Sequence, residues 1–176
     1  MIRIGVTPTE TLAAGDRLNP AALGGATRNT LIKFLTRPTV EAVALTARSP
    51  QEAELEAKQK ECDFIVYTTV SHKRGGGGGL GGFISKAAPI AEMMTTGGAG
   101  GYGTETAPPE SASASGVSKS VKSKDELTLI HKLQPVGASP MQPGTLKAKA
   151  KSDGEDIISP LAEQAATAVL SEATKK

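Results

Sequence analysis

The sequence predicts an α/β (α+β) domain with a mixed sheet of about five strands and with its helices packed on one face. Short β-branched runs alternate with helical patterns over residues 2–70, two runs of alternating apolar and polar residues follow residue 123, and a last amphipathic helix ends the chain. Helical crossovers make the first three strands parallel, and the later pair forms an antiparallel hairpin. The expected element order is therefore βαβαβββα.

The first strand and helix have clear boundaries. Residues 2–7 form a short β-branched run that ends at a proline, and residues 8–18 are expected to be a linker. Asn19 followed by Pro20 is typical of a helix N-terminus, and apolar residues then recur at helical spacing until Pro38.

A strand, a helix and a further strand follow. Residues 40–47 read as a strand, and Ser49-Pro50-Gln51-Glu52 is a capping box that starts a second helix. This helix carries two i,i+4 acid–lysine pairs and a modest apolar side; the residues are Glu54 with Lys58, Glu56 with Lys60, and Ala53, Leu55, Ala57 and Cys62. Residues 64–70 give the strongest strand pattern and are expected at the centre of the sheet.

Composition then divides the chain. Thirteen of the 20 glycines lie between Gly75 and Gly116, so residues 75–118 are interpreted as a Gly/Ala/Ser-rich insertion in a domain made of residues 1–74 and 119–176. Apolar residues within this insertion form a candidate interaction surface: Leu80, Phe83, Ile84, Ile90, Met93, Met94 and Tyr102.

The C-terminal third predicts a hairpin and a helix. Leu127, Leu129, His131 and Leu133 alternate with polar residues or Ile130, and Leu146, Ala148 and Ala150 alternate with Lys147, Lys149 and Lys151. An acidic run from Asp153 to Asp156 suits the start of a helix whose inward residues are Ile158, Leu161, Ala165, Ala168 and Val169.

The hairpin lysines join the candidate interaction surface. Lys147, Lys149 and Lys151, with Lys132 and with Lys122 and Lys124, are able to form a basic sheet face. Two interpretations stay open: a solvated face that keeps the sheet from pairing with other chains, or a contact for an acidic partner.

No residue pattern predicts a catalytic, cofactor-binding or metal site. Cys62 is the single cysteine, the glycine run lacks the lysine and hydroxyl of a phosphate-binding loop, and Asp153, Glu155 and Asp156 lack calcium-loop spacing. His72 and His131 become neighbours if their strands pair, although two histidines without a cysteine or a firm carboxylate partner are more often surface residues than a metal site. We therefore expect no cofactor and no enzyme.

Net charge and composition limit the classes of partner that the chain is expected to bind. The formal net charge is only +2 and aromatic residues make up 3%, so a nucleic-acid partner is not expected. No apolar run reaches the roughly 18 residues of a membrane-spanning helix, so no transmembrane span is expected.

Three segments carry a family resemblance: IRIGV at residues 2–6, CDFIVYTTV at residues 62–70, and the KAKAKSDGED…AEQAA…L run at residues 147–170. They resemble the anticodon-binding-like domain of bacterial envelope lipoproteins, which include the curli-secretion channel protein, the lipoprotein activators of penicillin-binding proteins and the N-terminal domain of the Tol propeller protein. They also look like an uncharacterised family of exported bacterial proteins. No lipobox cysteine stands near the first residue.

The resemblance implies a periplasmic or extracellular, non-enzymatic module that binds other envelope proteins or assembles as a homo-oligomer. An alternative of a different class is the structural subunit of an extracellular filament or tube, because head-to-tail contacts extend a chain of subunits without closing it.

Overall fold

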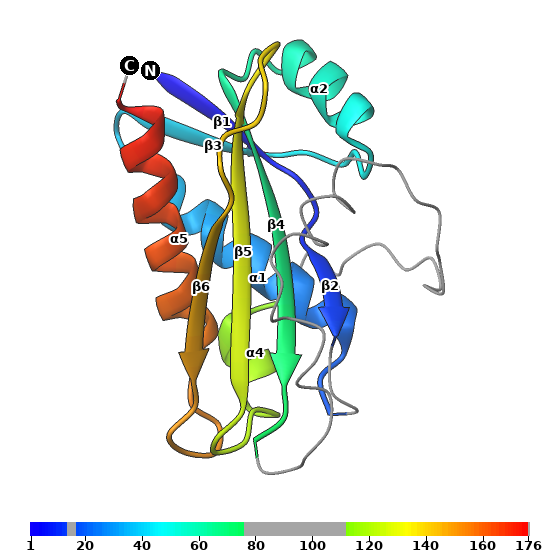
Figure 1. The fold of residues 1–176 in the computed structure, drawn as a ribbon, viewed down its shortest axis with the longest axis vertical. Helices are drawn as coiled ribbons and strands as arrows, with labels where there is room; N and C mark the ends of the chain where they lie inside the picture. Colours follow the sequence, from blue (N-terminus) through cyan, green and yellow to red (C-terminus); the bar gives the residue numbers. More distant parts are fainter. Residues whose placement is uncertain (14–16, 76–111, 176) are drawn as a thin grey trace.

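The computed structural model describes residues 1–13, 17–75 and 112–175. They form a six-stranded sheet in the order β3-β1-β4-β5-β6, with β2 paired to β4 off this path (Figure 1). The elements in chain order are β1 (Ile2–Val6), β2 (Glu10–Ala13), α1 (Pro20–Leu35), β3 (Val40–Ala44), α2 (Pro50–Gln59), β4 (Phe64–Lys73), α4 (Ala114–Ser118), β5 (Glu126–Pro135), β6 (Gly144–Lys149) and α5 (Ile158–Ala173).

The predicted mixed α/β class is confirmed. β1 lies parallel to β3 and β4, whereas β5 lies antiparallel to both β4 and β6. β4 is central, as its apolar run predicted, and its continuation to Lys73 gives it ten residue pairs with β5. Ten consecutive pairs make β4 and β5 the longest ladder among the described residues.

Helices lie on both faces of the sheet, so the expectation that they share one face is wrong. Helices α1, α4 and α5 bury a large core against residues such as Ile4 and Phe64, whereas α2 covers a smaller cluster around Leu45 and Ile65. The chain crosses from β1 outward to β3 and then back past β1 to β4. Because both crossovers are right-handed but run in opposite directions along the sheet, their helices must cover opposite faces.

The expected linker contains a strand. β2 pairs in parallel with the second half of β4, from Thr69 to Ser71, whereas β1 pairs only with Phe64 to Val66. The Thr9 hydroxyl also lies 2.7 Å from that of Thr68. Because β4 extends beyond β1, the later part of this edge of β4 has no partner in β1. The chain after Pro8 pairs with that part as β2. The four-residue strand has no strong pattern of its own.

The predicted helix starts are confirmed. Asn19 Oδ1 accepts the N–H of Ala22 at 3.0 Å, and Ser49 Oγ accepts the N–H of Glu52 at 3.3 Å. At the start of α5, Asp156 Oδ1 accepts the N–H groups of Ile158 and Ser159, each at 3.0 Å. These side chains satisfy donors that the first helical turn leaves unpaired.

Helix α2 matches its prediction except at Leu55. Both predicted ion pairs form, at 2.9 Å for Lys58–Glu54 and 2.8 Å for Lys60–Glu56. Ala53 and Ala57 are buried, but Leu55 is 62% exposed, so its place on the inward side is wrong. The helix meets the sheet along its alanine stripe, and Leu55 lies outside that contact.

The C-terminal elements also follow the predicted pattern. Leu127, Leu129 and Leu133 are buried, and β5 and β6 form the expected hairpin. Helix α5 contacts both α1 and the sheet, so Ala162 and Ala166 are buried in addition to the predicted inward residues. Ala168, which the sequence placed on the inward side, is only half-buried. Within the range expected as insertion, Ala114 and Val117 of α4 are buried in the main core.

Candidate interaction surface

Strand β6 presents two lysines on the face of the sheet away from α1 and α5. Leu146 and Ala148 pack toward the core, so Lys147 and Lys149, which alternate with them, project from the opposite face and are exposed. Residues two apart on a strand lie roughly 7 Å from each other on one face. The predicted placement of these two lysines is therefore confirmed.

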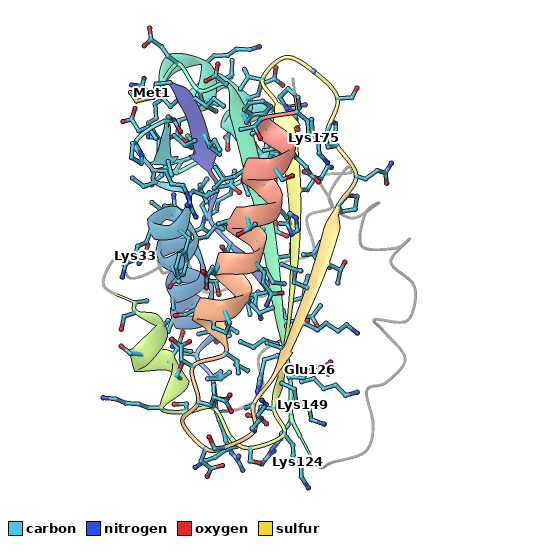
Figure 2. The ribbon with its side chains drawn as sticks, turned by 90° about the vertical axis from the view of Figure 1, so that its left-hand side faces the viewer. Met1, Lys33, Lys124, Glu126, Lys149 and Lys175 are labelled. Atoms are coloured by element: carbon cyan, nitrogen blue, oxygen red, sulfur yellow. The ribbon has the colours of Figure 1, made fainter. Side chains whose placement is uncertain are left out.

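Neighbouring strands extend this charged row. Lys149 pairs with Glu126 of β5, and Glu126 pairs with Lys73 of β4, so these three residues lie in line across the sheet. Figure 2 shows Glu126 and Lys149 close together near one end of the molecule.

Lys132 lies on the same face, farther along β5. It pairs with Tyr67 of β4 and stands six residues after Glu126. An even spacing keeps residues of one strand on the same face of a sheet, so Lys132 and Glu126 project together. We call Lys73, Glu126, Lys132, Lys147 and Lys149 the lysine face, which carries four positive charges and one negative charge.

The other predicted lysines lie in the turns beside this face and not on its strands. Lys151 follows β6 in a loop, where its N–H donates to the carboxylate of Glu155. Lys122 pairs with Asp153 at 3.1 Å, in the turn region that precedes β5. Lys124 adopts a positive φ of 73° in the same region. The basic surface is therefore narrower than the sequence suggested, because these three lysines lie in the turns that flank the hairpin strands.

Three lysines outside this face have ion-pair partners among the described residues. Lys58 and Lys60 on α2 each pair with a glutamate one turn away. Among the described residues, no ion pair involves the four lysines of the lysine face. Among the described residues of this face, only Glu126 opposes their positive charge, so the face is complementary to an acidic surface.

Strand pairing does not bring the two histidines together. His72 lies opposite Leu127 and His131 lies opposite Thr68, so the two positions are four residues apart along the ladder. His72 Nε2 instead lies 3.0 Å from Asp125 Oδ2. Within the described ranges, no three His, Cys, Asp or Glu side chains are placed to hold a metal ion.

Both histidines are buried, so the expectation that they are surface residues is wrong. His131 lies on the core face, between β4 and β6. A Cβ atom added to Gly144 would lie 2.3 Å from its Cε1 atom, so the imidazole occupies the space that a side chain at position 144 would need. Burial lowers the pKa of His131, while the negative charge of Glu172 on α5 acts in the opposite direction. A buried imidazole of this kind packs the core and does not meet solvent.

Cys62 is buried beside α2. Burial raises the pKa of its thiol, although the positive charges of Arg3 and Lys60 act in the opposite direction. Its Sγ lies 3.9 Å from the carbonyl oxygen of Lys60. A thiol of raised pKa has little thiolate at neutral pH, so Cys62 behaves as a small core residue.

The remaining predicted contact residues lie outside the described ranges: Leu80, Phe83, Ile84, Ile90, Met93, Met94 and Tyr102. In the part of the chain that the structure describes, no helix has the length and apolar character needed to cross a bilayer.

A polar groove between α1, α4 and α5 was not predicted. Its residues come from three separate parts of the chain, and two of them had another explanation in the sequence. Phe34 belongs to the apolar pattern of α1, and Asp156 belongs to the acidic start of α5. Only the packing of the three helices brings them together, so the sequence contains no signal for the groove.

No protein-family model matches the chain, and no curated protein matches it. Two solved structures are similar in shape. A PelC dodecamer from Paraburkholderia phytofirmans has 11% sequence identity and a TM-score of 0.47, with 99% of this chain and 89% of that chain covered. A putative neuraminyllactose-binding hemagglutinin homolog from Helicobacter pylori has 11% identity and a TM-score of 0.37, with 99% and 81% covered. Likeness at this level carries no information on function.

Proposed function

We propose that this chain is a non-enzymatic binding or assembly module of the cell envelope or extracellular space, which acts through protein–protein contacts and forms homo-oligomers. The observation that carries the proposal is the lysine face on β4, β5 and β6. Exposed lysines that lack ion-pair partners in the described part of the chain are available to an acidic protein surface.

The two histidines and the cysteine, which lie in the described part of the chain, have structural contacts. His72 and Asp125 contact each other in the interior, and His131 fills the space beside Gly144. The Cys62 thiol is buried, and burial raises its pKa. These assignments support a role in binding over a role in catalysis.

A second copy of the chain offers one acidic partner. Glu52 and Glu61 are exposed at opposite ends of the α2 region, and the side chain of Glu61 is 86% exposed. The lysine face and the α2 region are different patches on the same face of the sheet, because Lys132 pairs with Tyr67 and Tyr67 packs in the cluster under α2. Contact between them is either reciprocal across a two-fold axis, which gives a dimer, or head-to-tail, which gives a ring or a filament depending on the rotation between copies.

Charge reversal tests the proposal. Lys147→Glu with Lys149→Glu should weaken self-association of the full chain, as measured by sedimentation velocity at low and at physiological salt. The matched control is Lys119→Glu with Lys175→Glu, which changes the net charge equally at exposed positions elsewhere. If the parent is monomeric at every concentration, or if both double variants behave alike, the proposal of assembly through this face is wrong.

A rescue experiment identifies the acidic partner. Adding Glu52→Lys and Glu61→Lys to the first double variant should restore association if α2 of another copy meets the lysine face.

Electron microscopy of the parent then separates closed rings from filaments. Fractionation of cells that express the protein from its native gene tests the proposed envelope location.

A further inference from the structure

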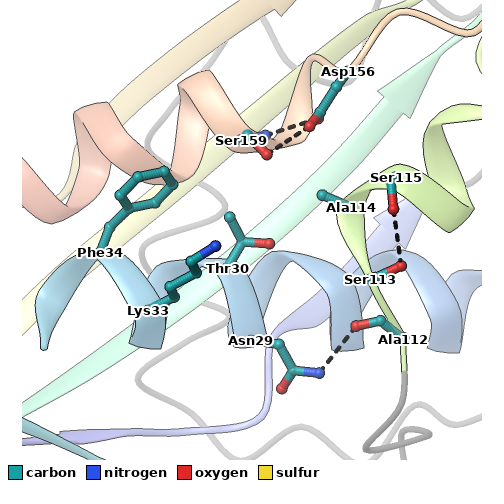
Figure 3. Close-up of a pocket in the computed structure, with 10 residues that line it drawn as sticks. All are labelled: Asn29, Thr30, Lys33, Phe34, Ala112, Ser113, Ala114, Ser115, Asp156 and Ser159. Carbon is teal, nitrogen blue, oxygen red and sulfur yellow. Dashed lines mark hydrogen bonds between the residues drawn. The ribbon is translucent and has the colours of Figure 1, made fainter.

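A groove of about 340 Å³ lies on the side of the molecule that carries α1, α4 and α5. Figure 3 shows Thr30, Lys33 and Phe34 on the side of α1 that faces α5, whereas Asn29 points toward Ala112, just before α4. The volume falls in the range of sites that hold small molecules. The groove is separate from the lysine face, which lies across the sheet.

Internal hydrogen bonds hold the rim of the groove. Ser159 Oγ donates to Asp156 Oδ2 at 2.6 Å, and Asn29 Nδ2 donates to the carbonyl oxygen of Ala112 at 3.0 Å. The hydroxyls of Ser113 and Ser115 lie 3.3 Å apart. The positions of these polar groups are therefore set before any ligand arrives, which reduces the entropy lost on binding.

Two polar groups on α1 remain available. Among the described residues, neither Thr30 Oγ1 nor Lys33 Nζ takes part in a side-chain hydrogen bond or an ion pair. Both side chains point from α1 toward α5 in Figure 3. Together with Asp156 Oδ2, which has a lone pair beyond the bond to Ser159, they supply a donor, a mixed hydroxyl and an acceptor.

This set of groups excludes several ligand classes. One carboxylate is too few for a divalent cation, which takes about six oxygen ligands. One lysine beside Asp156 gives no net positive charge for a phosphate. The apolar lining is limited to Phe34, Ala112 and Ala114, which is too little for a wholly apolar ligand.

We propose that the groove binds a neutral saccharide ring. Vicinal hydroxyls of a pyranose donate and accept at neighbouring positions, which matches Lys33 as donor, Asp156 as acceptor and Thr30 as both. The half-buried ring of Phe34 provides an apolar surface for the C–H face of the sugar. The remaining hydroxyls of the groove surround the ligand with further acceptors.

Saturation-transfer NMR on the full chain tests this assignment, with D-glucose and cellobiose as neutral probes and with D-glucuronate and inorganic phosphate as anionic probes. We expect saturable binding of a neutral probe with a Kd in the millimolar range, about 1 to 10 mM. Thr30→Val and Lys33→Met should each weaken binding by about two- to tenfold, because each removes one hydrogen bond. Phe34→Leu should weaken it by removing the aromatic face.

Thr167→Val is the matched control, because it removes a hydroxyl from the exposed side of α5 away from the groove. It should leave sugar binding unchanged. The proposal is overturned if neither neutral probe binds at concentrations up to about 50 mM, or if the three groove variants bind as the parent does. Binding of phosphate or glucuronate alone would also overturn it, because that result assigns the groove to an anion held by Lys33.

Discussion

His72 Nε2 and Asp125 Oδ2 lie 3.0 Å apart, and each side chain is only 2% exposed. The same carboxylate accepts the backbone N–H groups of Gly75 and Lys122, both at 2.9 Å. Burial alone would raise the pKa of Asp125, but the hydrogen bonds from Gly75, Lys122 and His72 outweigh burial and hold it below its ordinary value. One carboxylate thus joins the end of β4 to the turn before β5.

Replacing Asp125 with Asn should destabilise the protein by about 2–4 kcal/mol. The amide places N–H groups where an oxygen now accepts a backbone donor, and it removes the negative charge beside the His72 ring. Chemical denaturation at neutral pH measures the loss. Asp153→Asn is the matched control, because Asp153 also accepts a backbone N–H but has a 61% exposed side chain. An equal loss in both variants would contradict the structural role given to Asp125.

The lowered pKa of Glu56 predicts that the folded protein loses stability in acid. Although burial favours the neutral form, hydrogen bonds from Lys60 and from the N–H groups of Ala47 and Thr46 lower the pKa of Glu56 from 4.5 to about 2. A lowered folded-state pKa stabilises the protein above the unfolded-state value, and this contribution is lost as the pH falls from about 4.5 to about 2. The full contribution is up to about 3 kcal/mol.

Glu56→Gln should therefore flatten the dependence of unfolding free energy on pH below about 5, as measured by denaturant titrations at several pH values. At neutral pH, Glu54→Gln is the control for the loss of an i,i+4 pair alone, and about 0.3–0.5 kcal/mol is expected. If Glu56→Gln keeps the acid dependence of the parent, other carboxylates cause it.

Gly144→Ala should destabilise the hairpin by about 1–3 kcal/mol. The new Cβ would lie 2.3 Å from His131 Cε1 and 2.5 Å from Nε2, so the buried imidazole must move. A double-mutant cycle with His131→Ala measures this collision, because the glycine change should cost much less once the imidazole is absent. Additive losses would place the cause in the backbone at position 144.

Replacing residues 76–111 with a short Gly/Ser linker should leave a folded domain. The described residues on either side are already held, since Asp125 accepts the N–H of Gly75 and Asn29 donates to Ala112. Thermal unfolding followed by circular dichroism should give a cooperative transition. Loss of cooperative unfolding would mean that the replaced segment belongs to the core.

Local signals predicted most of the elements correctly. Asn19 and Ser49 are caps whose side chains bond to residues three positions away, so their effect needs no distant partner. The alternation of leucine and polar residues from Leu127 to Leu133 likewise sets which face is buried, because side chains on a strand alternate regardless of its neighbours.

Tertiary structure decided the relationships among these elements. Leu55 lies on a helix that begins where its capping box predicted but outside the helix's contact with the sheet, and β2 forms only because β4 extends past β1. The contact between His72 and Asp125 joins two residues that are far apart in the chain. Caps and alternation are properties of a few adjacent residues, whereas helix placement, strand edges and the groove depend on how distant segments pack, and no short pattern encodes that packing.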